Sequence, residues 1–159
     1  MAEYSANALQ TLTDASPALP FTESPVPCRK GFIFHRDGSS NFNLASPSKI
    51  NGKFWGGCCC NKRMLEAQYE VAFHANIAIS EGGTVGPISL AIAIDGNVDP
   101  SSQMTVTPAA VGDFFNVGAE LMVAVPAICG CESISIVKTS AGPVDVQNAN
   151  LVINPKQIA

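Results

Sequence analysis

LEAQYEVAFHANIAIS, residues 65–80, decides the fold. Apolar side chains recur at every second position from Tyr69 to Ile79, and polar or small side chains fill the positions between them. Alternation with period two places the two sets on opposite faces of a β-strand, whereas a helix would need a period of 3.6 residues. The stretch therefore predicts one long strand with a single apolar face.

The same pattern continues on both sides of this strand. Residues 81–83, Glu-Gly-Gly, predict a turn, residues 88–94 alternate again, and Asp95-Gly96-Asn97 predicts the next turn. Further short strands are expected at 31–36, 41–44, 104–107, 120–125, 132–139 and 144–153. Because strands follow one another at short spacing without intervening helices, the chain is expected to be all-β, an antiparallel β-sandwich or jelly roll.

The first 28 residues differ from the rest. Four prolines, at positions 17, 20, 25 and 27, fix the backbone as extended and exclude a helix. We expect an N-terminal arm over residues 1–28 and a jelly-roll domain over residues 29–159. The arm is either a disordered terminus or an anchor on a neighbouring subunit, and its deletion is expected to leave the domain folded. The candidate anchoring side chains are Tyr4, Leu9, Leu12 and Phe21.

The composition is poor in charge. Charged residues make up 14% of the 159 residues, against roughly 25% in a typical soluble domain. A chain with so few charges is expected to hide part of its surface against copies of itself or other proteins. The net charge of −4 and the scattered Lys and Arg residues argue against a nucleic-acid partner. No secretion signal and no membrane span are evident, so we expect synthesis in a cytoplasm and no membrane partner.

Alanine occupies several outward positions of the expected strands, where a solvated face usually carries Thr, Lys, Glu or Arg. Small uncharged side chains suit close packing against another subunit. The alternative is that a loop or the N-terminal arm covers them within one chain. The candidate interface residues are Ala72, Ala78, Ala91, Ala93 and Ala124.

No catalytic constellation is evident. His35 and His74 are isolated and lack the spacing of a zinc enzyme, so both are interpreted as structural. A Gly-x-Ser-x-Gly elbow and a P-loop are both missing from the sequence. The carboxylates at expected turns nominate no glycosidase pair; they are Asp37, Glu81, Asp95 and Asp99. We therefore expect neither an enzyme nor a cofactor.

Six cysteines leave three possibilities open. Beside Cys28 there are two clusters, formed by Cys58, Cys59 and Cys60 and by Cys129 and Cys131. If their loops meet, the clusters are weak candidates for a zinc site or for a disulfide. Their spacing departs from the C-x2–4-C pattern of structural zinc sites, and reduced thiols are the default in a cytoplasm.

Phe54 and Trp55 lie beside Gly56-Gly57 and are the candidate platform for a surface glycan. Jelly rolls commonly bind ligands through such loops. The alternative is that Trp55 packs over the end of the sandwich.

The sequence resembles small proteins encoded by phages and prophages of Firmicutes. The matching stretches are Thr84–Gly96, Pro25–Cys28, His35–Gly38, Val144–Leu151 and Tyr4–Asn7. More distantly, the β-part is similar to TNF-like jelly rolls, including the C-terminal domains of bacterial collagen-like spore-surface proteins, which form tight trimers. The loop at residues 56–60 departs from these families, and the chain has no Gly-X-Y stalk.

This resemblance implies a virion structural protein, a capsid decoration or head-fibre subunit that forms homo-oligomers, with trimers expected. It implies the major capsid protein or other virion proteins as partners and the virion as location, after synthesis in the host cytoplasm. The alternatives are a fibre-tip module that binds carbohydrate or a cell surface, and a bacterial spore or cell-surface assembly protein.

Overall fold

The structure is a computed structural model that describes residues 1–28, 32–45, 48–50, 53–55, 67–126 and 131–158, with 48–50, 53–55 and 157–158 as backbone only. Sheet A has the strand order β12-β8-β14-β1-β3, and β2 also pairs with β14. Its strands are β1 (Ala2–Ala6), β2 (Gln10–Leu12), β3 (Glu23–Val26), β8 (Ala67–Ile79), β12 (Phe115–Val125) and β14 (Val144–Ile158).

Sheet B has the order β10-β9-β13-β5-β4, and β11 also pairs with β9. Its strands are β4 (Ile33–Phe34), β5 (Phe42–Ala45), β9 (Ile88–Ile94), β10 (Asn97–Val98), β11 (Met104–Val106) and β13 (Cys131–Lys138). A separate hairpin joins β6 (Ser48–Ile50) to β7 (Lys53–Trp55), and a short 3-10 helix, η1, spans Pro100–Ser102.

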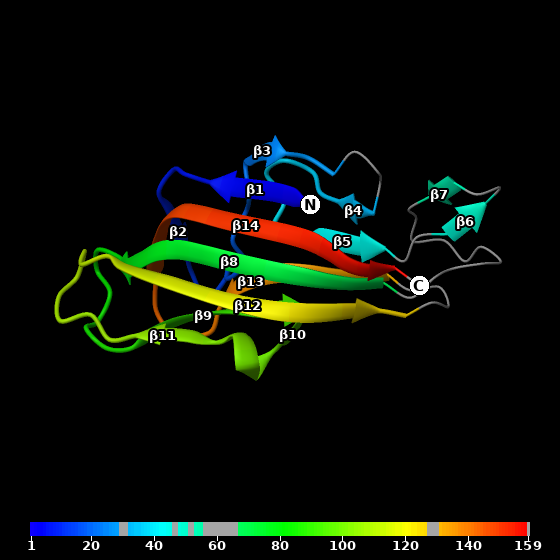
Figure 1. Cartoon of the computed structure of the whole chain (residues 1–159). Coiled ribbons are helices and arrows are strands. Elements are labelled where there is room, and N and C mark those ends of the chain that lie inside the picture. The colour runs from blue at the N-terminus through cyan, green and yellow to red at the C-terminus, as the bar shows by residue number, and fades with distance from the viewer. Residues whose placement is uncertain (29–31, 46–47, 51–52, 56–66, 127–130, 159) are drawn as a thin grey trace.

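The two sheets stack as a β-sandwich with β8, β14 and β12 in one layer and β9 and β13 in the other (Figure 1). Strands distant in the sequence pair side by side, β14 with both β1 and β8, and β13 with both β5 and β9. The chain passes repeatedly between the two sheets, and every ladder among the described strands is antiparallel, so the sandwich is jelly-roll-like. The predicted all-β antiparallel sandwich is confirmed.

Strand β8 shows why this sequence builds a sandwich. Tyr69, Val71, Phe73, Ala75 and Ile77 are all buried, while the side chains between them are partly or fully exposed. The period-two pattern thus puts one face of sheet A against sheet B and leaves the other face outside.

The predicted turns match the structure as well. Asp95 and Gly96 both have positive φ, 50° and 80°, and they form the two-residue loop between β9 and β10, where Ile94 pairs with Asn97. Such a loop needs φ above zero at both central residues, and Asp-Gly meets that need at low cost. Gly82 has positive φ in the other expected turn, and Gly38 and Gly142 have positive φ at further turns.

The N-terminal segment corrects the prediction of a separate arm. Its backbone is extended, as expected from the prolines, but β1 and β2 pair with β14 in sheet A. Further along, Lys138 N donates to Pro17 O and Leu19 N donates to Ile136 O, so the segment then follows β13 in sheet B. Proline blocks only its own N–H, and the residues between the prolines remain able to pair at a sheet edge.

Side chains from this segment complete the core. The Phe21 ring contacts Phe42 and Phe73 edge to face, with centroids 5.2 Å and 6.5 Å apart, and Tyr4 contacts Phe42 at 4.7 Å. Burial, with a smaller contribution from the nearby Cys28, raises the pKa of Tyr4 to about 12. Residues 1–28 are therefore an integral part of the sandwich.

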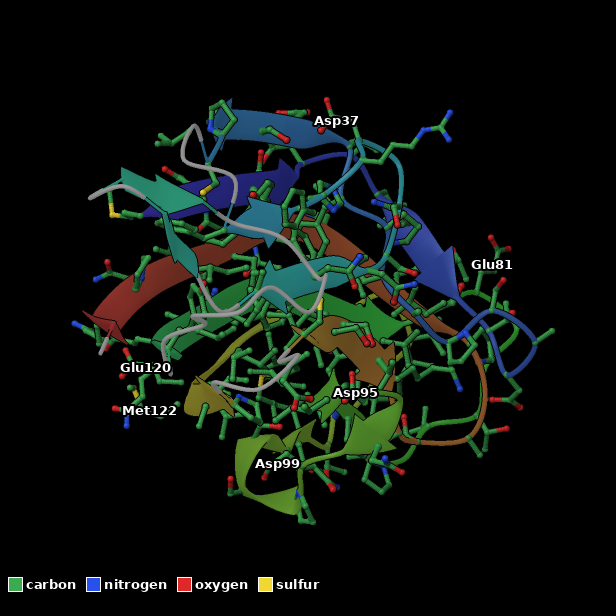
Figure 2. The ribbon with its side chains drawn as sticks, turned by 90° about the vertical axis from the view of Figure 1, so that its right-hand side faces the viewer. Asp37, Glu81, Asp95, Asp99, Glu120 and Met122 are labelled. Atoms are coloured by element: carbon green, nitrogen blue, oxygen red, sulfur yellow. The ribbon has the colours of Figure 1, made fainter. Side chains whose placement is uncertain are left out.

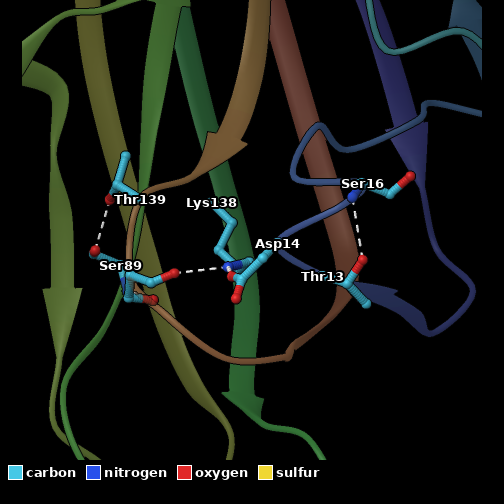
Figure 3. A network of polar contacts seen from close by, with 7 residues as sticks. Thr13, Asp14, Ser16, Ser89, Lys138 and Thr139 are labelled. Atoms are coloured by element: carbon cyan, nitrogen blue, oxygen red, sulfur yellow. Dashed lines mark hydrogen bonds and ion pairs between the residues drawn. The ribbon is translucent and has the colours of Figure 1, made fainter.

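A buried lysine ties the segment to sheet B (Figure 3). The Lys138 side chain is 2% exposed, and its ammonium donates to the Asp14 carboxylate and, at 2.7 Å, to Ser140 O. A buried cation is tolerated only when it is paired and hydrogen-bonded. This contact fixes the loop after β2 to the end of β13.

Candidate interface on sheet A

The outer face of sheet A, turned away from sheet B, is built from the residues that β8 does not bury. Ala72 lies between Glu120 of β12 and Val152 of β14, and the next step of the ladder places His74 between Gly118 and Asn150. A shallow hollow of about 600 Å³ is centred here. Its lining includes Ala72, His74, Gly118, Glu120, Asn150 and Val152.

Gly118 deepens this hollow because it presents no side chain. A Cβ at this position would lie 3.1 Å from Phe73 O and 3.6 Å from His74 Cβ. Together with Ala72 it leaves a floor of backbone and small side chains between polar neighbours. Such a floor lets another backbone or a flat ligand approach closely.

Around the hollow, polar side chains bond to one another across the strands. Asn150 Nδ2 donates to Glu3 Oε1 at 2.7 Å, and Asn116 Nδ2 donates to Asn76 Oδ1 at 3.1 Å. Lys156 and Glu70 form an ion pair at 2.6 Å. These contacts satisfy several of the polar groups of this face within the chain.

Strand β12 lies at one edge of sheet A, and among the described strands it pairs only with β8. Its Met122 is 52% exposed, and Phe114 and Phe115 at its start are 40% and 42% exposed. Figure 2 shows Glu120 and Met122 projecting from this strand at one edge of the molecule. Its eleven residues include neither Lys nor Pro, the residues that usually protect an edge, and a long edge of this kind is a template for another chain.

Only part of the predicted alanine interface is available. Ala72 is half-buried and Ala124 is exposed, and both belong to the outer face of sheet A. Ala78, Ala91 and Ala93 are buried within the chain, at 0–1% exposure, so the alternative of coverage within one chain holds for them and the interface prediction is wrong there. A small side chain is easily covered by its neighbours, which the alternation alone does not reveal.

The most exposed apolar residues of this edge were missed by the sequence reasoning. The alternation at 120–125 predicts a strand there but does not extend back to Phe114 and Phe115, and it does not say whether the strand lies at an edge. The available signal was a run of eleven residues containing a single charged side chain, Glu120.

The anchoring prediction is wrong for three of its four residues. Tyr4, Leu12 and Phe21 are buried in the core of their own chain, so none of them is free to hold a partner. Leu9 is 57% exposed in the loop between β1 and β2.

The two histidines have different settings. His35 Nδ1 lies 3.1 Å from Asn41 O, and its Nε2 lies 3.2 Å from Phe21 O, so the ring holds three segments together. His74 is exposed on the outer face of sheet A, beside the hollow. His35 therefore has the structural role expected of it.

The ligand platform and most of the cysteines fall outside what the structure describes. Phe54 and Trp55 belong to β7, of which only the backbone is described, so that candidate stays a prediction. Cys58, Cys59, Cys60 and Cys129 lie outside the described residues. Among the described residues, Cys28 is a free thiol, Cys131 is disulfide-bonded, and no cluster of three metal-ligating side chains occurs. At Cys131, of the three possibilities left open by the sequence, the disulfide is the one found.

The four carboxylates expected at turns fall into separate regions. Figure 2 shows Asp37 and Glu81 apart from Asp95 and Asp99, which lie on either side of β10. The Asp95 side chain is hydrogen-bonded to that of Glu132 in β13. The hydrogen bond to Glu132 and the bond from Ser133 N, at 2.8 Å, lower the pKa of Asp95. The hydrogen bond with Asp95 is the main cause that raises the pKa of Glu132 to about 7, and burial is the second cause.

No helix in the described part of the chain has the length and apolar character needed to cross a membrane.

Comparisons with known proteins give no family. Neither a known protein family nor a curated protein matches the sequence. Among solved structures, the chain is similar to a family 35 carbohydrate-binding module from Cellvibrio japonicus Abf62, with 12% identity, 96% of this chain and 100% of that chain covered, and a TM-score of 0.35. A family 35 carbohydrate-binding module from Clostridium thermocellum matches at 11% identity, 95% and 98% coverage and a TM-score of 0.34.

The sugar-binding C-terminal domain of EclA matches at 12% identity, with 76% of this chain and 82% of that chain covered and a TM-score of 0.34. At these identities and TM-scores, the similarities carry no argument about what the present chain binds.

Proposed function

We propose that this protein is a non-catalytic structural subunit that associates with copies of itself through the outer face of sheet A and the edge strand β12. The observation that carries the proposal is the edge of β12, which is unpaired among the described strands; Met122 is exposed on its outer face, and Phe114 and Phe115 are exposed at its start. Unpaired backbone groups and apolar surface occur together there, and both are satisfied by contact with another chain.

A second copy of the chain is the occupant that fits this surface best. Several polar groups of the outer face already bond within the chain, among them Asn150 with Glu3 and Lys156 with Glu70. These groups therefore do not need partners from another kind of molecule. The low fraction of charged residues, 14%, supports the same assignment, because a surface buried in an assembly needs no charged side chains for solubility.

The sequence resemblance supplies the setting of the proposal. It implies a capsid decoration or head-fibre subunit on a phage particle, with a trimer as the expected assembly. Mass spectrometry of particles induced from a strain that carries the gene tests this setting. Particles are expected to contain the chain in many copies, and its absence from purified particles would contradict the virion assignment.

The self-association itself is tested by placing a charge on the proposed interface. Met122→Arg adds a bulky cation at an exposed position of β12, and sedimentation velocity is expected to show a shift from oligomer to monomer. Val85→Arg is the matched control, since Val85 is 53% exposed in a loop outside both sheets. An oligomer that survives Met122→Arg, or a wild type that sediments as a monomer, would contradict the proposal.

A further inference from the structure

A second hollow lies at the far edge of sheet B, on the β4–β5 hairpin. Its volume is about 670 Å³. Its lining residues include Cys28, Phe34, Arg36, Ser39, Asn41 and Asn43. The self-association described above does not use this surface, because β4 is an edge of sheet B and β12 is an edge of sheet A.

Four side chains of this hairpin are available to a ligand. Phe34 is 40% exposed and lies directly opposite Asn43 in the ladder, while Arg36 follows β4 and Asn41 precedes β5. All four residues line the same hollow, so their side chains surround one space. Arg36, Asn41 and Asn43 are engaged in no side-chain hydrogen bond or ion pair among the described residues.

Several contacts fix the backbone of the β4–β5 hairpin that carries these side chains. The His35 ring stacks on Phe42 with centroids 4.1 Å apart, and its two nitrogens face the carbonyl oxygens of Asn41 and Phe21. Asn41 N also donates to Ser39 Oγ at 3.1 Å. A site whose backbone is fixed in advance loses little entropy when a ligand binds.

The chemistry of the set points to one class of ligand. An exposed aromatic ring offers a flat apolar surface to the C–H groups of a pyranose. A carboxamide donates and accepts hydrogen bonds, as a sugar hydroxyl requires. A guanidinium without a protein carboxylate within 4 Å prefers a planar anion, and the nearest acidic residue in sequence, Asp37, has its Oδ1 bonded to Ser24 Oγ at 2.6 Å.

From this geometry we infer that the β4–β5 hollow binds an acidic sugar, a pyranose that carries a carboxylate. Phe34 stacks on the sugar ring, Arg36 binds the carboxylate, and Asn41 and Asn43 bind hydroxyl groups. The inference is independent of the proposed self-association, since monomers and oligomers alike expose this edge.

The test is calorimetric titration of the full chain with tri-galacturonic acid and with its uncharged methyl ester. The acid is expected to bind and the ester to bind about 10-fold more weakly or not at all, because a charged hydrogen bond is lost. Arg36→Gln is expected to weaken binding of the acid by a similar factor, and Phe34→Ala to weaken binding of both compounds.

Val111→Ala is the matched control, since Val111 is also 40% exposed but lies in the loop between β11 and β12. It is expected to leave binding unchanged. Circular dichroism confirms that each variant is folded, which the exposed positions of the replaced side chains allow. The inference is overturned if the wild type binds neither compound, if acid and ester bind equally, or if Arg36→Gln and Phe34→Ala bind as the wild type does.

Discussion

The N-terminal segment offers the sharpest test of the fold. Phe21 is fully buried between Phe42 and Phe73, although it belongs to a stretch that the sequence alone suggests is an arm. We expect Phe21→Ala to lower the free energy of unfolding by about 3–5 kcal/mol, the usual cost of removing a buried phenylalanine side chain. That is a large share of the roughly 5–15 kcal/mol that stabilises a typical domain.

Deleting residues 1–28 is expected to abolish folding altogether. The deletion removes Phe21 together with Tyr4, Leu12 and Leu19, which are all buried, and it also removes the strands that pair with β14. The combined loss is on the order of 10 kcal/mol or more.

Urea unfolding followed by circular dichroism measures both changes. Leu9→Ala is the control within the same segment, because Leu9 is 57% exposed and its truncation is expected to change stability by about 0.5 kcal/mol at most. The reasoning is refuted if the truncated chain unfolds cooperatively at the wild-type midpoint, or if Phe21→Ala costs no more than Leu9→Ala.

Three further variants probe polar contacts. Ser102→Ala leaves the buried Ile92 N–H without its 2.8 Å acceptor and is expected to cost about 1–3 kcal/mol in urea unfolding. In the wild type, the hydrogen bond from Lys138 lowers the pKa of Asp14 from 3.8, so this contact is expected to lose its stabilising effect as pH falls from about 5 to 3. Asp14→Asn removes the carboxylate, and thermal melts are expected to show a smaller loss of stability over this pH range. The pKa of Glu132 is raised from 4.5 to about 7 in the folded protein, so the wild type is expected to lose stability as pH rises from 4.5 to about 7. Glu132→Gln removes this carboxyl, and the variant is expected to show no such loss.

Each of these expectations has a clear contrary result. Wild-type stability in Ser102→Ala would mean that the hydroxyl is not needed at Ile92 N. An unchanged loss of stability at acid pH in Asp14→Asn would contradict the role of its contact with Lys138. A Glu132→Gln variant that keeps the wild-type pH profile would contradict the raised pKa of Glu132 and its hydrogen bond with Asp95.

The local pattern predicted the fold because the polarity of each residue in a strand indicates whether its side chain faces the core or the solvent. Tyr69, Val71 and Phe73 alternate with polar neighbours, and this alone identifies β8 and its buried side. The Asp95-Gly96 turn was predictable for a similar reason, since few residue pairs adopt two successive positive φ values.

Pairing between distant strands was not predictable from such local patterns. Whether residues 1–28 leave the domain or join it depends on β14, more than a hundred residues away, and no short-range signal records that pairing. The same limit applies to Ala91 and Ala93, whose coverage comes from the assembled chain, and to β12, whose position at an edge is a property of the whole sheet.

Hydrogen exchange along β12 tests the central claim most directly. We compare the wild type with Met122→Arg and follow the amides of residues 115–125, which include the backbone groups not bonded to β8. If copies of the chain associate through this edge, those amides are protected in the wild type and exchange faster in the variant, while β9 stays unchanged in both. Equal exchange of β12 in the two proteins would contradict an interface on sheet A.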